Sequence, residues 1–150
     1  MMQGKILKVV TSVIVVMLLG VVLLGCGKSE PAGPSVEPEY AGDIAERMLL
    51  AFDTGDYAAY SERLDPPMMQ AMPEDTFQQG RAFIREKIGD YISKEFVETQ
   101  IVEEVYMVVI YKAKYSNEPA DVKVTVTFME TDAGILVSGL YFDSPKLRSQ

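Results

Sequence analysis

The sequence contains no histidine and no tryptophan, and it has one cysteine among its 150 residues. Without histidine, the chain lacks the usual general base near neutral pH and the commonest transition-metal ligand. With a single cysteine, it can form no disulfide within the chain. The sequence therefore disfavours catalysis by histidine, and the fold must be stabilised by its hydrophobic core.

Basic residues are also scarce. The 14 lysines and arginines face 22 acidic residues, which leaves a net charge of −8. Lys5 and Lys8 are the only charged residues before Cys26, so the chain without its first 25 residues is more acidic still. A surface of this sign repels phosphate backbones, and the composition therefore disfavours nucleic-acid binding.

The first 26 residues form a distinct segment. Lys5 and Lys8 precede an almost wholly apolar run over residues 9–24. A helix over that run would span about 24 Å, which is short of a hydrocarbon core of ~30 Å, so a signal peptide is favoured over a spanning helix. The alternative is an uncleaved N-terminal anchor, and both interpretations place the rest of the chain outside the cytoplasm.

The apolar run ends in the sequence LLGC at residues 23–26, which resembles the lipobox of bacterial lipoproteins. The resemblance implies that residues 1–25 are a cleaved signal peptide and that Cys26 carries fatty acyl chains such as palmitate. It also implies an extracytoplasmic protein anchored to the cell membrane. Residues 26–38 then form the lipidated cysteine and a flexible tether, because the stretch is rich in Gly, Pro, Ser and Glu.

Residues 39–145 have the patterning of a folded domain, followed by a polar tail at 146–150. Apolar residues at helical spacing predict helices over residues 39–52, 57–64 and 74–88, with a short turn over 67–72. Asp56 suits the N-cap of the second helix. The prolines at 66–67 and the glycine at 89 are typical of helix ends.

From about residue 91 the period changes to two. Alternating apolar residues predict strands over 96–102, 105–115, 121–129 and 135–142, each separated by a turn sequence. Helices followed by hairpin-connected strands indicate an α+β fold. We expect about three N-terminal helices packed on a curved four-stranded antiparallel meander, with one face of the sheet covered.

Three short stretches carry a family resemblance: AFDTGDY at 51–57, KIGDY at 87–91 and SGLYF at 138–142. With the order of elements, they resemble the NTF2-like (cystatin-like) cone over about residues 40–143, and in particular small extracytoplasmic domains of unknown function of the DUF3887 kind. The resemblance implies a pocket between helices and sheet for a small apolar ligand, and the alternative is ordinary core packing. Its candidate lining residues are Phe52, Tyr57, Tyr60, Met107, Tyr111, Tyr115, Phe128 and Tyr141.

Other candidate chemistry is weaker. Three methionines over residues 68–72 could suit a cuprous ion, but thioethers more often fill gaps in a core. Calcium binding by residues 103–104 lacks an Asp-x-Asp-x-Asp loop. We therefore predict no catalytic residue, metal or cofactor. The carboxylates considered as a general base are better explained as caps, turn formers or solvated charges: Asp56, Asp65, Asp90 and Glu104.

Three functions remain open. The favoured one is an envelope lipoprotein whose domain binds a small ligand or a protein partner without catalysis. The second is an enzyme of the isomerase or hydratase type that uses a pocket carboxylate. The third is a structural module that forms a homodimer through the outer face of the sheet, where Tyr106, Val108 and Ile110 would form the contact patch.

Overall fold

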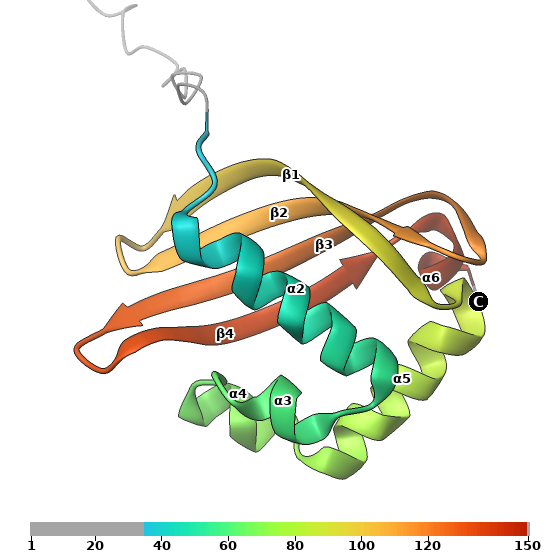
Figure 1. Cartoon of the computed structure of the whole chain (residues 1–150), viewed down its shortest axis with the longest axis horizontal. Coiled ribbons are helices and arrows are strands. Elements are labelled where there is room, and N and C mark those ends of the chain that lie inside the picture. The colour runs from blue at the N-terminus through green and yellow to red at the C-terminus, as the bar shows by residue number, and fades with distance from the viewer. Residues whose placement is uncertain (1–34, 150) are drawn as a thin grey trace, which may run out of the picture. The chain divides into compact units, whose positions relative to one another are not determined.

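The computed structural model describes residues 35–149. The predicted signal peptide, Cys26 and most of the predicted tether lie outside the described residues. The described chain has four helices, a four-stranded sheet and a last short helix (Figure 1). The elements are α2 (Glu39–Thr54), α3 (Tyr57–Ser61), α4 (Pro66–Ala71), α5 (Glu74–Ile88), β1 (Tyr91–Val102), β2 (Tyr106–Tyr115), β3 (Glu118–Thr131), β4 (Gly134–Asp143) and α6 (Pro145–Arg148).

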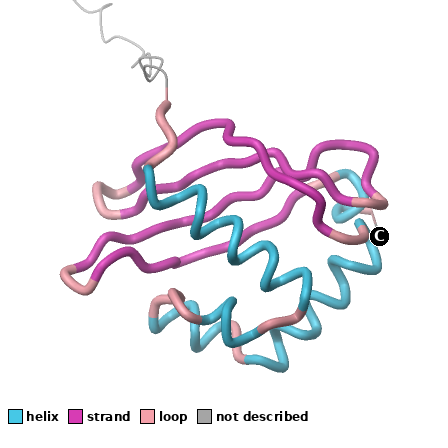
Figure 2. The backbone as a smooth tube through the Cα atoms, viewed as in Figure 1, coloured by secondary structure: helices cyan, strands magenta, loops and turns pink. Residues whose placement is uncertain are grey.

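The sheet is an antiparallel meander with the strand order β1-β2-β3-β4, which confirms the predicted α+β class. Figure 2 shows α2 crossing one face of the four strands. That face and the helices enclose one hydrophobic core, to which α2 contributes Ala41, Ala45 and Met48 at spacings of four and three residues. Gly55 ends α2 in a left-handed conformation, φ +81°, that favours glycine.

We expected about three helices, and the described chain contains five. Residues 66–71 form α4 rather than a turn, and residues 145–148 form α6 rather than part of a tail without structure. Each has proline in its first turn and a side-chain N-cap: Asp65 accepts from the Met68 N–H at 2.7 Å and Ser144 from the Leu147 N–H at 3.3 Å. These caps stabilise helices that are too short to show a periodic pattern.

Strand β1 begins at Tyr91, five residues before the predicted start. Its register against β2 shifts between Tyr91 and Ser93 and again between Phe96 and Glu98. These shifts interrupt the apolar alternation, and the first five residues of the strand were therefore not predicted.

Strand β4 contains a bulge that reverses its faces. Thr127 pairs with Gly139 and Phe128 with Val137, so that Ser138 is an extra residue. Strict alternation from Val137 predicts that Tyr141 points into the core, and this prediction is wrong. After the bulge, Leu140 and Phe142 pack against the core, and Tyr141 is 64% exposed.

Next to the bulge, the outer edge of β4 pairs with residues 63–65. The Val137 N–H donates to the Arg63 carbonyl at 2.7 Å, and the Val137 carbonyl accepts from the Asp65 N–H at 2.9 Å. This pairing ends α3 earlier than predicted, because Leu64 forms a bridge with the sheet instead of a helical turn. None of the helices within residues 35–149 is long and apolar enough to cross a membrane.

Candidate functional site

The predicted pocket residues are divided between the core, its margin and the outer surface. Phe52, Tyr60 and Phe77 contact one another, with ring centroids 4.7–5.9 Å apart. Tyr57 lies 5.4 Å from Phe77, a residue the pocket prediction did not include. These rings fill the space between α2, α3 and α5. The remaining predicted residues are buried at Tyr111, Tyr115 and Phe128, half-buried at Met107 and exposed at Tyr141.

The three stretches that carry the family resemblance meet at one end of the molecule. The ring of Phe52 lies 5.3 Å from that of Phe142, and Tyr115 lies 6.4 Å from Phe142 and 5.7 Å from Tyr91. The Asp53 carboxylate accepts a hydrogen bond from the Tyr91 N–H at 3.0 Å. The stretch at 51–57 ends α2, and the other two stretches hold this last turn against the sheet.

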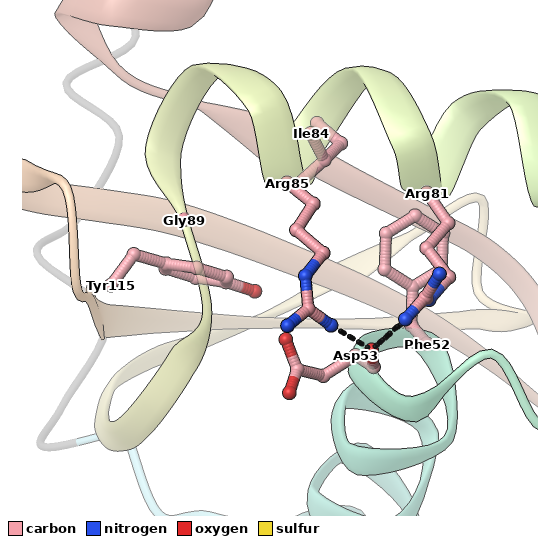
Figure 3. A pocket seen from close by; sticks show the side chains of 7 residues that line it. All are labelled: Phe52, Asp53, Arg81, Ile84, Arg85, Gly89 and Tyr115. Carbon is pink, nitrogen blue, oxygen red and sulfur yellow. Dashed lines mark hydrogen bonds between the residues drawn. The ribbon is translucent and has the colours of Figure 1, made fainter.

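A small hollow lies beside this junction (Figure 3). Figure 3 shows the guanidinium groups of Arg81 and Arg85 pointing toward the backbone carbonyl of Asp53, to which they donate at 2.7–3.1 Å. Arg85 also forms an ion pair with Asp90. These contacts satisfy a carbonyl that the end of α2 leaves without a helical partner. The hollow has a volume of about 10 Å³, far below the ~300–1,000 Å³ of most ligand sites.

A second polar cluster lies between α2 and β1. The hydroxyl of Tyr91 donates to Glu46 at 2.9 Å, and that of Tyr111 donates to Glu37 at 2.8 Å. The Lys94 ammonium lies 4.6 Å from the Tyr111 ring centroid and 3.7 Å from Glu46, with its side chain only 12% exposed. Burial, and then the bond to the carboxylate, raises the pKa of both tyrosines. Both hydroxyls therefore stay protonated and act as donors that hold the start of the domain on the sheet.

The carboxylates considered as a general base have structural partners. Asp56 caps α3 by accepting from the Ala59 N–H at 3.1 Å, Asp65 caps α4, and Asp90 pairs with Arg85. Glu104 lies in the β1–β2 turn with φ +60°. Three of the four are thus committed to backbone or arginine contacts.

Glu118 is a buried carboxylate that sequence reasoning missed. It accepts from the backbone N–H groups of Ala120 at 3.3 Å and Lys146 at 3.1 Å, so it ties α6 to β3. A hydrogen bond from Ser144 is the largest cause that lowers the pKa of Glu118. The pKa of Asp121 is also lowered, chiefly by its hydrogen bond with Lys114. Both shifts favour the charged form, whereas a general base near neutral pH needs a raised pKa.

No group of three or more Cys, Asp or Glu residues within 35–149 is placed to hold a metal ion. Of the three methionines considered for a cuprous ion, Met68 and Met72 pack against the core and Met69 is exposed. The hydroxyl of Tyr57 donates to the Met72 carbonyl at 3.0 Å, which fixes the end of this segment against α3.

A larger hollow, with a volume of about 200 Å³, lies at the opposite end of α2. Here the helix-side face of the sheet extends past the first turn of the helix. In Figure 1 the β1–β2 and β3–β4 turns lie at this same end. We call this feature the open-end hollow. Its lining residues are Tyr40, Ile101, Glu104, Val105, Tyr106, Met107 and Glu130.

The face of the sheet turned away from α2 carries an apolar row. Val102 pairs with Tyr106, Tyr106 with Met129, and Met129 with Leu136, so that one apolar residue of each strand lies in line. The patch predicted at Tyr106, Val108 and Ile110 belongs to this face, but Ile110 is buried by its neighbours.

The family comparison covers part of the region that contains these features. No curated protein sequence matches the chain. A family model described as "Protein of unknown function (DUF3887)" matches residues 45–133, from within α2 to the β3–β4 turn. Because the match spans more than half of the 150 residues, the chain belongs to the DUF3887 family of proteins of unknown function.

Proposed function

We propose that the chain is a lipid-anchored extracytoplasmic protein whose NTF2-like domain binds a protein partner without catalysis. The anchor is Cys26, and residues 27–35 are the tether, because Val36 and Glu37 accept hydrogen bonds from Thr99 and Tyr111 of the sheet. The order of charge, apolar run, LLGC sequence and polar linker supports the anchor. A coil of this length has a root-mean-square reach below roughly 20 Å, which would hold the domain close to the bilayer.

The anchor is tested by metabolic labelling with a fatty acid. We expect the wild-type chain to incorporate the label and to sediment with membranes, and Cys26→Ser to lose the label. Ser29→Ala, three residues away in the tether, is the matched control and should label normally. A native product that retains Met1 and carries no acyl group would contradict the proposal.

The NTF2-like assignment rests on the order of the elements and the placement of α2. Helices precede a four-stranded antiparallel meander, and α2 crosses one face of it, as in the cone-shaped fold. This is a fold-level analogy, and it carries no chemistry by itself.

The filled interior is the observation that carries the binding assignment. The rings of Phe52, Tyr60 and Phe77 occupy the space where the resemblance implies a pocket, and their close contacts leave them in a packed core. A ligand there would have to displace aromatic side chains. Binding therefore takes place on the surface, which favours a protein partner over a small apolar ligand.

Native mass spectrometry of the full chain purified from its producing cells tests this step. We expect additional mass that corresponds to a polypeptide. Additional mass of a few hundred daltons that survives gentle desolvation would indicate a small ligand and contradict the assignment.

A homodimer is a second candidate, favoured by the apolar row across the outer face. A dimer through this face would bury Tyr106, Met129 and Leu136, and Met129→Lys would place a charge in its centre. Light scattering of the full chain in detergent should then report two copies for wild type and one for the variant. Glu74→Lys on α5 is a control for the added charge, and a wild-type monomer at high concentration would exclude this candidate.

A further inference from the structure

The open-end hollow combines an apolar floor with carboxylates from two strand ends. Ile101 and Val105 are 71% and 57% exposed, although both lie beside the half-buried Met107. Glu104 from the β1–β2 turn and Glu130 from β3 lie among the same lining residues. The volume of about 200 Å³ is below the ~300–1,000 Å³ of pockets that enclose a drug-sized ligand, which fits a surface hollow that takes side chains of a docked segment.

Charge is distributed unevenly around this hollow. The stretches that form this end of the domain, residues 35–44, 98–109 and 126–137, contain no lysine and no arginine. Glu130 also acts on the hollow, since its charge is a cause, after burial, of the raised pKa of Tyr40. The acidic residues of the three stretches are Glu37, Glu39, Asp43, Glu98, Glu103, Glu104, Glu130 and Asp132.

The β1–β2 turn holds two of these carboxylates in an unfavourable backbone conformation. Glu103 and Glu104 have φ of 53° and 60°, the left-handed region that hairpin turns usually fill with Asn or Gly. The chain thus keeps Glu104, which lines the hollow, and the adjacent Glu103 in a turn where a glycine would be less strained.

We propose that the open-end hollow binds a cationic amphipathic segment of the partner protein. An apolar side chain of the segment lies on Ile101 and Met107, and a lysine or arginine lies between Glu104 and Glu130. The inference rests on the proposed function as a binding module and specifies its surface and the chemistry of its partner.

The same charges argue against the other occupants. Anionic lipid headgroups and the acidic end of a second copy would both be repelled, because the field around the hollow is negative. A cationic segment instead gains attraction on approach and buries apolar surface on contact.

The test uses the full chain in micelles of a non-ionic detergent and a fluorescein-labelled peptide of alternating valine and lysine. Binding is followed by anisotropy at 0.15 M salt, after subtraction of binding to empty micelles. We expect Glu104→Gln and Glu130→Gln each to raise the Kd about three- to tenfold, and Ile101→Ser to do the same. The matched controls Glu74→Gln and Glu86→Gln on α5 should leave the Kd within about twofold.

Besides a failure to bind the peptide, four outcomes would overturn the inference. In the first two, acetylation of the peptide's lysines leaves its Kd unchanged, or the variants of the hollow bind the peptide as wild type does. In the third, the chain binds phosphatidylglycerol vesicles more tightly than the peptide. In the fourth, a Lys28→Gln chain binds the peptide more tightly than wild type. The last would mean that the chain's own tether occupies the hollow. A chain that carries the acyl label but does not bind the peptide would refute this inference and leave the anchor proposal intact.

Discussion

The Asp53 carboxylate accepts a hydrogen bond from the Tyr91 N–H at 3.0 Å, which joins the last turn of α2 to the first residue of β1. The two residues are 38 positions apart, and each belongs to a stretch that carries the family resemblance. The backbone carbonyl of Asp53 meanwhile accepts from Arg81 and Arg85. Asp53 thus connects α2, α5 and β1. These contacts give the stretches at 51–57 and 87–91 a structural role.

Asp53→Ala tests the importance of this junction. The substitution leaves the half-buried Tyr91 N–H without its partner, and we expect the free energy of unfolding to fall by about 1–3 kcal/mol. Urea denaturation measures the change. Asp43→Ala on the exposed side of the same helix is the control, and equal losses for the two variants would contradict the structural role.

Phe77 is the centre of the aromatic core. It is 0% exposed and contacts the rings of Phe52, Tyr57 and Tyr60. Phe77→Ala should lower the free energy of unfolding by about 3–5 kcal/mol, because it removes buried area and leaves a cavity. Phe83→Ala, on the same helix but at a residue 49% exposed, should cost far less in the same denaturation experiment. A small effect at Phe77 would indicate an interior that is loosely packed and open to a ligand.

The bulge at Ser138 leaves a buried polar atom. Within the described residues, its Oγ is the one buried side-chain oxygen or nitrogen without a hydrogen-bond partner. Ser138→Ala should therefore raise the free energy of unfolding by up to about 1 kcal/mol, since the desolvation cost of the hydroxyl disappears. The exposed Ser93→Ala is the control. A loss of stability in Ser138→Ala would show that the hydroxyl bonds to an ordered water or another group.

The buried tyrosines predict a loss of stability at alkaline pH. Burial raises the pKa of Tyr60 to about 12, with a smaller contribution from Tyr57. Tyrosines in the unfolded chain ionise near pH 10, so the unfolded state gives up protons that the folded state retains. Stability is therefore full below pH 10 and falls between pH 10 and 12, by about 1.4 kcal/mol per pH unit for each such tyrosine.

Urea denaturation from pH 8 to 11.5 measures this decline. Tyr60→Phe removes one ionisable group, so its slope above pH 10 should be shallower than that of wild type, whatever its stability at pH 8. Identical slopes would show that Tyr60 ionises in the folded state as it does in water.

Local patterns were sufficient for much of the fold. The three longer predicted helices start within a residue of α2, α3 and α5, and four strands lie where the period of two predicts them. The α+β class and the antiparallel meander follow from that order. These features depend on contacts close in sequence, which is why the residue spacing predicts them.

The candidate site required contacts that are distant in sequence. The eight predicted pocket residues share apolar character, but this character does not distinguish a lined pocket from a filled core. Packing of Phe52 and Tyr60 on Phe77 decides between them, and three different helices supply these rings. The open-end hollow was missed because its members come from α2, β1, the β1–β2 turn, β2 and β3.

The sequence by itself determined the acidic charge, the absence of histidine, the LLGC segment and the order of helices followed by strands. Only the tertiary structure decided which faces of those elements are buried. The bulge at Ser138 turned Tyr141 outward, and the cap at Asp65 formed α4 where a turn was expected. These features depend on the pairing of Val137 with the 63–65 segment and on single hydrogen bonds. Neither is visible as a periodic pattern in the sequence.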